Sequence, residues 1–507
     1  MKSFFLTLLS FIALQTFAQS DDSGRGFSYA VEMSGTISNG AHSPLWLSAN
    51  RYGLSSTERN SGYIRRKFGR TVMNDSIRHL MLSYNTDFVV PVNYTSSFVV
   101  QQLYAEAKWR KGVLTIGQKE HPLQLKDNKL SSGSQTFGIN ARPYPEIRLA
   151  LPEYWEIPGT KSFLAFKGHI AWGAFTDNRF QKHFAENQAT YHQNVLMHTK
   201  AGYLRFGKPQ KPFNIEAGIE LASQFGSTHY EYTDQTYKKI QNAHNLAAFW
   251  HAFIGGGADA EDGATQNNEG NMLGSWVLRL NYDTQDATYG LYADHFFEDH
   301  SGMFLLDYDG YAYENGHMTK KDHRYRYYPM KDIMLGFDVH LKKCQWLSDA
   351  VLEYVYTKYQ SGAVYTDRTP QLPEHIGGVD NYYNNGLEPG WQHWGQTLGN
   401  PLYLSPVYNT DGKLFFHNNR FVAWHLGLAG QPTANLHYRL RATWQEGLGT
   451  YDKPYFNPKH NVSLGIEARY DLHQYVKGLS AGAAFGFDRG ALMGNNTGGT
   501  LTLRFER

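Results

Sequence analysis

The side chains best suited to bind a ligand gather in one long segment, residues 360–420. Aromatic, acidic, amide and imidazole groups stand there among Gly, Pro and Asn. Aromatic faces stack on sugar rings and polar groups bond sugar hydroxyls, so this composition suits a glycan site. The alternative is that the aromatics only pack a long loop against its neighbours. The candidate glycan-binding residues are Tyr365, His375, Asp380, Tyr382, Tyr383, Trp391, Trp394 and Asn400.

A second group of residues could hold a divalent cation. Carboxylates and imidazoles cluster at an expected strand end, as Asp294, Glu298, Asp299 and His300, with His295 between them. Such oxygen and nitrogen ligands bind divalent metals. The spacing is not diagnostic of a metal site, so we favour a strand end whose charges are answered by nearby lysines and arginines. Binding of sugar hydroxyls is a third interpretation.

No pattern in the chain predicts catalysis. Glu153 and Glu156 lie three residues apart in an expected Pro-bounded turn, whereas paired glycosidase carboxylates must flank a bond at about 5 to 9.5 Å. Cys344 stands in an expected short turn with no histidine partner implied nearby. No Ser-His-Asp or metal motif is present, so we expect no catalytic residues, no cofactor and a protein that is not an enzyme.

Composition narrows the class further. The net charge of +2 argues against a nucleic-acid partner, and a single cysteine cannot form an internal disulfide. Residues 1–18 have the charged, apolar and small-residue order of a secretory signal peptide, which leaves 19–507 as a single domain. An aromatic content of 15% with 49 glycines suits a membrane β-barrel, although a large soluble β-sandwich could share it.

Period-two alternation of apolar and polar residues is the strongest structural signal. Between Asn435 and Gln445 every even-numbered residue is apolar and every odd-numbered one is polar. In a barrel one such face meets lipid and the other lines the lumen. The polar faces carry residues that we expect to form ion pairs inside the lumen, with attraction of acidic polysaccharide as a secondary role: Arg279, Arg439, Arg441, Arg469 and Arg504, together with Glu467 and His437.

The connections between these strands alternate in length. Short links are expected at 110–111, 207–212, 283–287, 345–348, 431–434 and 472–477, and long ones at 118–141, 175–192, 225–273, 298–331, 360–420, 447–459 and 489–497. Short periplasmic turns opposite long extracellular loops are typical of outer-membrane barrels. The sequence therefore predicts an all-β transmembrane antiparallel barrel of about 18 strands, with sixteen as the lower count and both termini periplasmic. Its last strand, at the end of the chain, should close against the first.

Several stretches make the chain resemble the Wzi-type capsule assembly outer-membrane β-barrel family. They are SQTFGINARPYPEIR at 134–148, FFEDHSGM at 296–303 and GWQHWGQTLGNPL at 390–402, with PLWLSANRYG at 44–53 extending the likeness over most of the mature chain. The resemblance implies an eighteen-stranded barrel that binds capsular polysaccharide and helps to assemble or anchor the capsule.

The sequence thus predicts an outer-membrane protein of a Gram-negative bacterium with a binding role. Its expected partners are capsular or related surface polysaccharide, outer-membrane lipid and other capsule-export proteins, and we expect a monomer. Two rivals are a substrate-specific porin, which steady conductance in a planar bilayer would reveal, and an outer-membrane enzyme, which release of reducing ends would reveal.

Overall fold

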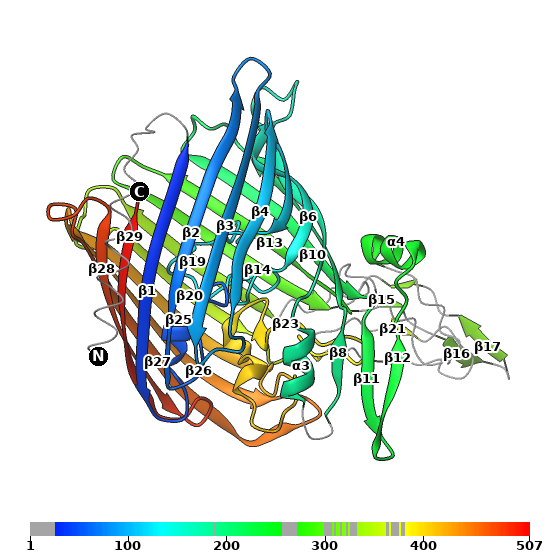
Figure 1. The fold of residues 1–507 in the computed structure, drawn as a ribbon. Coiled ribbons are helices and arrows are strands. Elements are labelled where there is room, and N and C mark those ends of the chain that lie inside the picture. Colours follow the sequence, from blue (N-terminus) through cyan, green and yellow to red (C-terminus); the bar gives the residue numbers. More distant parts are fainter. Residues whose placement is uncertain are drawn as a thin grey trace.

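The chain forms a closed antiparallel β-barrel (Figure 1). The computed structural model describes residues 26–185, 189–255, 271–298, 332–360 and 381–507, and the backbone of several short strands between them. The main sheet has 18 strands, which confirms the predicted fold class and count. The predicted signal peptide, residues 1–18, lies outside the described residues.

Each barrel strand pairs with the next barrel strand along the chain. Strand β29 pairs with β1, with Leu503 opposite Met33, so the ring closes without a free edge as predicted. The barrel strands are β1 (Phe27–Asn39), β2 (Asn60–Asp75), β3 (Leu80–Val92), β4 (Val99–Trp109), β5 (Gly112–Gln118), β6 (Pro145–Glu156), β7 (Leu164–Ala174), β9 (Leu196–Phe206), β10 (Phe213–Phe225), β13 (Asn271–Asp283), β14 (Ala287–Glu298), β19 (Ile333–Leu341), β20 (Asp349–Tyr356), β25 (Phe421–Thr433), β26 (Leu436–Gly449), β27 (Pro454–Asp471), β28 (Leu479–Gly490) and β29 (Asn496–Glu506).

Smaller elements occupy the links. No helix among the described residues is long and apolar enough to cross a membrane. The helices are α2 (Leu45–Ser48), α3 (Asn178–Phe184), α4 (Leu246–Ile254) and the 3₁₀ turns η2 (Pro401–Tyr403) and η3 (Pro406–Tyr408). The small strands are β8 (Tyr191–Gln193), β11 (Thr228–Thr233), β12 (Thr236–Gln241), β15 (Asp307–Tyr308), β16 (Tyr311–Glu314), β17 (His317–Lys320), β18 (His323–Arg324), β21 (Tyr365–Thr366), β22 (His375–Ile376), β23 (Gln392–His393) and β24 (Gln396–Thr397).

Links at the two ends of the barrel differ in length, as predicted. One end, the short-turn end, carries 76–79, 110–111, 157–163, 207–212, 284–286, 342–348, 434–435 and 472–478. The other, the long-loop end, carries 40–59, 93–98, 119–144, 175–195, 226–270, 299–332, 357–420, 450–453 and 491–495. The backbone of Tyr29 bonds that of Arg507, which places both ends of the barrel chain at the short-turn end.

Two links expected to be long are short. The link expected at 447–459 shrinks to 450–453, and the one expected at 489–497 to 491–495. Pairing continues past an irregularity between Gly447 and Gly449, and Gly449 takes a φ of +82° that favours glycine. Because such a bulge shifts the register, the alternation of side chains ends before the strand does.

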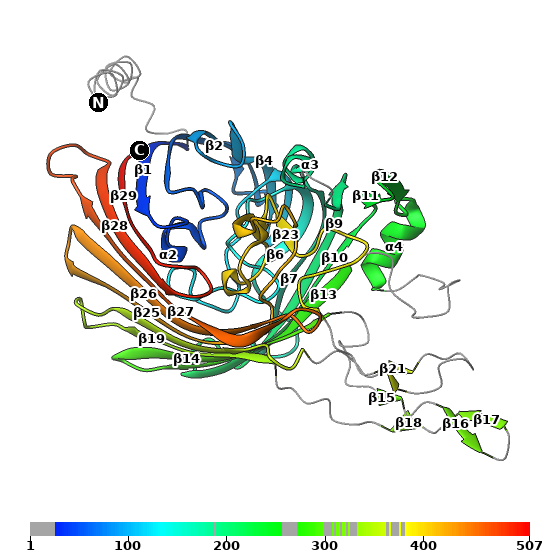
Figure 2. The same cartoon turned by 90° about the horizontal axis from the view of Figure 1, so that it is seen from below.

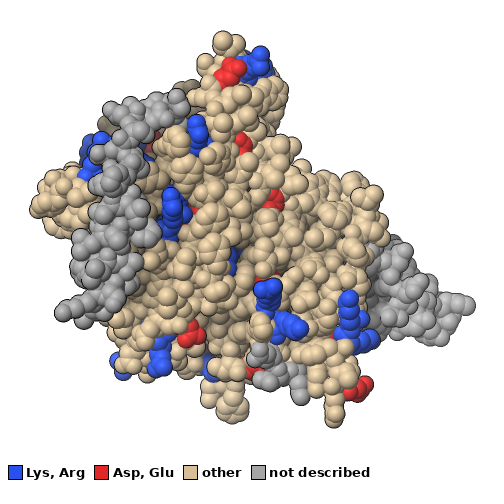
Figure 3. Space-filling view, in the orientation of Figure 1, with Lys and Arg blue, Asp and Glu red and all other residues tan. Residues whose placement is uncertain are grey.

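The outer wall of the barrel is apolar. In β26, the outward-facing Trp444 is 38% exposed and the lumen-facing Arg441 is 1% exposed, which matches the predicted faces. Few charged side chains lie on the wall shown in Figure 3. Outward-facing aromatics ring the short-turn end at Phe27, Trp109, Trp155, Phe213, Tyr282, Tyr289 and Tyr470, and the long-loop end at Trp172, Trp276, Trp424 and Trp444. An apolar band between two aromatic girdles is typical of a barrel that spans a membrane.

Ion pairs fill the lumen, as the polar strand faces predicted. Arg279 bonds Asp338 at 2.6 Å, and Arg439 and Arg441 each bond Glu467 at 2.8 Å. The remaining predicted lumen residues also have ionic partners: Arg469 and His437 contact Asp471, and Arg504 contacts Glu32.

Two turns predicted at the short-turn end have different outcomes. Glu153 and Glu156 were predicted in a turn but lie in β6, because the chain stays extended through an irregularity between Leu151 and Trp155. Glu153 accepts from Lys108 and Glu156 from Ser162. Cys344 is exposed in the link 342–348, as predicted.

Candidate functional site

Three links of the long-loop end turn into the barrel. They are 40–59 with helix α2, 119–144, which we name the crossing loop, and 357–420 over its described part 381–420; Figure 2 looks into the barrel past them. Their buried side chains form a core inside the ring of strands that includes Trp46, Trp391, Tyr383, Tyr403 and Phe416. The lumen is therefore packed by loops over part of its length.

The crossing loop spans the lumen and is fixed to the opposite wall. Asp127 begins its tip by accepting from the backbone N–H groups of Lys129 and Leu130. The Leu130 carbonyl accepts from His425 Nε2 at 2.7 Å. Glu353 accepts from Ser132 N at 2.7 Å and from Ser131 Oγ at 2.5 Å. Strands β20 and β25 thus hold a loop that starts at β5.

The segment 381–407 packs directly on the crossing loop. Gly138 N donates to the Leu398 carbonyl at 2.7 Å, and Trp391 Nε1 donates to the Thr136 carbonyl at 2.9 Å. A Cβ added at Gly138 would lie 2.3 Å from the Gly399 carbonyl oxygen. Only glycine permits this approach of two backbones, so the glycines of both stretches serve this contact.

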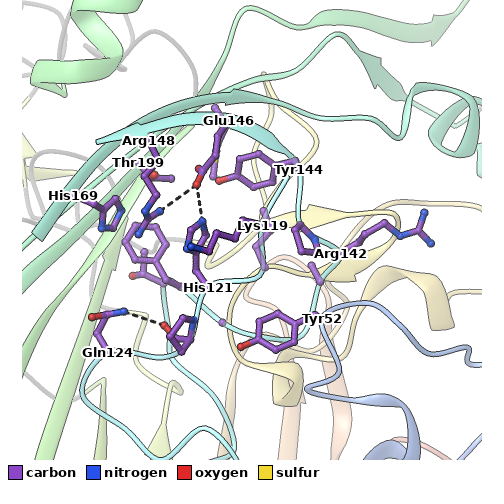
Figure 4. Close-up of a pocket in the computed structure, with 18 of the residues that line it drawn as sticks. Tyr52, Lys119, His121, Gln124, Arg142, Tyr144, Glu146, Arg148, His169 and Thr199 are labelled. Carbon is purple, nitrogen blue, oxygen red and sulfur yellow. Dashed lines mark hydrogen bonds and ion pairs between the residues drawn. The ribbon is translucent and has the colours of Figure 1, made fainter. Parts of the chain in front are cut away.

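A pocket with a cavity volume of about 100 Å³ lies between the crossing loop and the wall formed by β6, β7 and β9 (Figure 4). It is open to solvent and lies in the long-loop half of the barrel, because Lys119, Glu146 and Met197 flank the long-loop ends of their strands. The other residues used below are Tyr52, His121, Gln124, Phe137, Arg142, Tyr144, Arg148, His169 and Trp391.

Polar groups of this pocket form a charged network. Glu146 accepts from His121 Nε2 at 2.8 Å and from Arg148 at 3.4 Å. Burial, aided by the positive charge of Arg148, lowers the pKa of His121 despite its bond to Glu146. His121 is therefore neutral at pH 7. With Lys119 and Arg142 beside Arg148 and one carboxylate, the lining carries an excess of positive charge.

Aromatic side chains supply the apolar walls. Tyr52, Phe137, Tyr144 and Trp391 line the pocket together with Leu398. Burial raises the pKa of Tyr144 above its ordinary value, so its hydroxyl stays protonated and can donate. The pocket thus combines ring faces with several hydrogen-bonding groups, which is the chemistry that a sugar ring requires.

Arg142 and Trp394 lie together beside this pocket. The guanidinium carbon of Arg142 stands 4.3 Å from the Trp394 ring centroid, and its nitrogens donate to Ser96 at 3.1 Å and Thr95 at 3.5 Å. Burial lowers the pKa of Arg142 to about 10, so the group stays charged at neutral pH. Trp394 is half-buried and donates to Thr176 at 3.2 Å.

The structure buries four of the candidate glycan residues. Tyr382, Tyr383, Trp391 and Asn400 are fully buried, and of these only Trp391 lines the pocket. Tyr383 N donates to Glu298, Tyr382 to Asp332, and Asn400 Nδ2 to Ser132 Oγ. In this arrangement their side chains pack the loop, the alternative that the sequence left open.

Of the other four candidates in that segment, only the side chain of Trp394 is described. Trp394 keeps an accessible ring edge beside Arg142. Tyr365 and His375 belong to β21 and β22, and Asp380 lies outside the described residues. A glycan role for these three stays a prediction.

The predicted cation ligands do not come together as a metal site among the described residues. Asp294 is fully buried and accepts from Lys126 Nζ at 2.7 Å and Gln135 N at 3.0 Å. Glu298 accepts from Tyr383 N. At Asp294 the carboxylate is therefore buried and paired with a lysine, whereas we expected a hydrated strand end. Asp299 and His300 lie outside the described residues.

Most pocket residues were missed by inspection of the sequence. His121 and His169 come from distant parts of the chain and lie outside the four stretches that carry the family resemblance. A signal existed for Tyr52, which falls in the stretch 44–53, and for the pocket residues of the stretch 134–148, which are Arg142, Tyr144, Glu146 and Arg148.

Comparisons with known proteins identify the fold. No family model matches the chain, and no curated protein matches it by sequence. Among solved structures, Wzi of Escherichia coli, described as an outer-membrane protein involved in group 1 capsule assembly and a carbohydrate-binding β-barrel, has a TM-score of 0.54 at 12% identity, over 94% of this chain and 84% of that one.

Other outer-membrane barrels are also similar. OpdL of Pseudomonas aeruginosa gives a TM-score of 0.48 at 8% identity over 96% of this chain and 99% of its own. OccAB4 of Acinetobacter baumannii gives 0.46 at 8% identity over 96% and 100%. At 12% identity, the similarity to Wzi establishes the outer-membrane β-barrel fold and leaves the specific family open.

Proposed function

We propose that this protein binds surface polysaccharide, capsular or related, at the outer membrane and helps to assemble or anchor a capsule. In this proposal the long-loop end faces the medium and both termini face the periplasm, since short turns are periplasmic in outer-membrane barrels. The protein acts as a monomeric binding protein without a cofactor and not as an enzyme. Other capsule-export proteins are its further partners.

The observation that carries the proposal is the pocket beside the crossing loop. It brings aromatic rings and hydrogen-bonding groups together in one recess, which is the combination that ligand sites use. Tyr52, Phe137 and Tyr144 provide rings, while Gln124 and His169 provide groups for hydroxyls. The His169 Nε2 is buried without a hydrogen-bond partner among the described residues, so a sugar hydroxyl could bond it.

The charge of the pocket favours an acidic sugar. Lys119 pairs with Glu106 outside the lining, which leaves Arg142 and Arg148 against a single lining carboxylate, Glu146, that already bonds His121 and Arg148. A uronate or another carboxylate-bearing sugar would offset this excess. The printed description of Wzi as a carbohydrate-binding barrel adds support for testing polysaccharide first.

The proposal is tested by titrating the purified, refolded barrel with acidic capsular polysaccharide and its neutral counterpart in a calorimeter. Tyr144→Ala and Arg148→Gln should each weaken binding by at least about tenfold, since a stacked ring or a charged hydrogen bond contributes ~1–3 kcal/mol. The control is Trp346→Ala, which removes an exposed ring from the short-turn end. Unchanged affinity in both pocket variants would refute the proposal.

A transport role is the second candidate. Another pocket, with a cavity volume of about 270 Å³, lies toward the short-turn end and is lined by Lys126, Arg279 and Asp338. Gln124 lines both pockets, so a path could connect them past the crossing loop. Planar-bilayer recordings separate the two functions: the proposed anchor should show almost no conductance, whereas a porin shows steady open steps.

A further inference from the structure

Helix α4 lies on the outside of the barrel. Figures 1 and 2 both place it beside the wall, next to the end of β10. Phe225 of β10 packs against Ala248 and Ala252 of the helix, and Ser223 Oγ donates to the Ala252 carbonyl at 3.1 Å. Because the exposed Phe213 belongs to the same odd-numbered face of β10, these contacts are on the outward face of the strand.

The contacts of the helix fix its level along the barrel. The Phe253 ring stacks on Trp172 with centroids 6.2 Å apart and lies 5.5 Å from His198. Trp172 belongs to the aromatic girdle of the long-loop end, which marks the boundary between lipid and water. The helix therefore lies at a membrane interface.

The far side of α4 has an uncovered apolar row. Leu246 is 89% exposed, Trp250 59% and Ile254 47%. A spacing of four residues puts these side chains on one stripe of the helix. The Asn245 side chain caps the first turn by accepting from Ala248 N, and Gly255 ends the helix at a φ of +73°. The row thus belongs to a complete helix.

A lysine side chain contacts helix α4 from the outer face of the barrel. Lys200 lies on the outward face of β9, with the exposed Leu204 and Phe206, and its Nζ is 4.5 Å from the Phe253 ring centroid. No carboxylate among the described residues lies within ion-pair distance of it. A lysine on the lipid side of a barrel is costly except near the headgroups, where it can meet phosphate.

We propose that α4 is an interfacial helix whose row Leu246, Trp250 and Ile254 inserts into the lipid of the leaflet at the long-loop end. The apolar wall of the barrel continues into this row through Trp172 and Phe253, so one lipid surface covers both. A short helix with an apolar face and a cation beside it has the character of a membrane-surface segment. The occupant is lipid, not a partner protein or a second copy of the chain.

Spin labelling of the full-length barrel in phospholipid vesicles tests the proposal. Single cysteines replace Leu246 and Trp250 in a Cys344→Ser background, with Trp276→Cys as the lipid-facing reference and Lys413→Cys as the water-facing one. The labels at 246 and 250 should collide with oxygen and resist a water-soluble nickel complex to the same degree as the label at 276. A change in the heat-shifted gel mobility would identify a variant that fails to fold.

Vesicles that hold only this protein and lipid separate the possible occupants. Nickel collision rates at 246 and 250 that equal the rate at 413 would overturn the proposal, because a row made for a partner protein stays wet there. Protection that disappears when the protein is diluted tenfold in lipid would also overturn it in favour of a second copy. Protection that is independent of dilution supports lipid.

Discussion

Replacing Lys126 by methionine should destabilise the crossing loop more than removing either of its two neighbouring carboxylates, Asp294 and Glu220. The Lys126 side chain is 4% exposed and donates to Asp294 at 2.7 Å. Glu220 is a second buried carboxylate nearby, since Ser134 Oγ lies 3.2 Å from Asp294 and 3.5 Å from Glu220. Methionine keeps the length of the side chain but leaves two buried carboxylates without their cation.

The expected magnitudes follow from this arrangement. Removing one partner of a buried ion pair costs about 3–5 kcal/mol. Asp294→Asn should reduce the stability of the crossing loop by less, about 1–3 kcal/mol, because the charge of Lys126 keeps the nearby Glu220 carboxylate as a partner. Lys108→Met is the matched control: Lys108 pairs with Glu153 at the surface, where both side chains are at least 35% exposed, so its loss should cost under about 1 kcal/mol.

Hydrogen exchange of the backbone amides of 126–138 in the refolded barrel measures these costs, because the loop can open without unfolding the strands. Lys126→Met should speed exchange roughly a hundred- to several-thousand-fold, the equivalent of ~3–5 kcal/mol. If Lys126→Met exchanges no faster than Asp294→Asn, Lys126 is not the charge that fixes the loop.

Three further predictions concern the other loop contacts. Burial raises the pKa of Glu388 to about 7 against 4.5 for a free carboxyl, so the fold around Glu388 should lose stability as the pH rises from about 4.5 to 7, because burial disfavours the charged form more than the bonds from Ser227 and Asn242 favour it. Glu388→Gln should remove this dependence, and the same ratio of proteolysis rates between the two proteins at pH 5 and at pH 7 would contradict it. Glu353→Ala frees the tip of the crossing loop and should raise single-channel conductance above that of the parent barrel; no change in the bilayer would show that other contacts suffice. A chelator should leave exchange in 126–138 unaltered, because Lys126 occupies the position a cation would take at Asp294; an accelerated exchange would reinstate the metal hypothesis.

The inward loops change how function should be tested. Deleting residues 370–415 would remove Trp391 and Tyr383 from the core of the lumen along with any glycan contact. Loss of polysaccharide retention by such a deletion could then follow from a disrupted lumen. Single substitutions in the pocket, such as Tyr144→Ala, keep the core and separate the two causes.

Local patterns in the chain were enough to predict the barrel. Because a strand alternates its side chains with a period of two, residues such as Trp444 and Arg441 report their faces without any knowledge of their partners. Alternating link lengths likewise set the parity of the strands and placed both chain ends at one end of the barrel. Both features depend on residues close together in the sequence, so they can be predicted without the structure.

The packing of the lumen and the position of the pocket depend on contacts between distant segments, which are known from the folded protein alone. Trp391 and Tyr383 look like exposed loop aromatics in the sequence, yet their partners Thr136 and Gln135 lie about 250 residues away, at separations of 255 and 248. The pocket joins Tyr52, His121 and His169 from separate links and strands. A loop that enters a polar lumen and one that faces water can have the same composition, so only contacts between distant segments distinguish them.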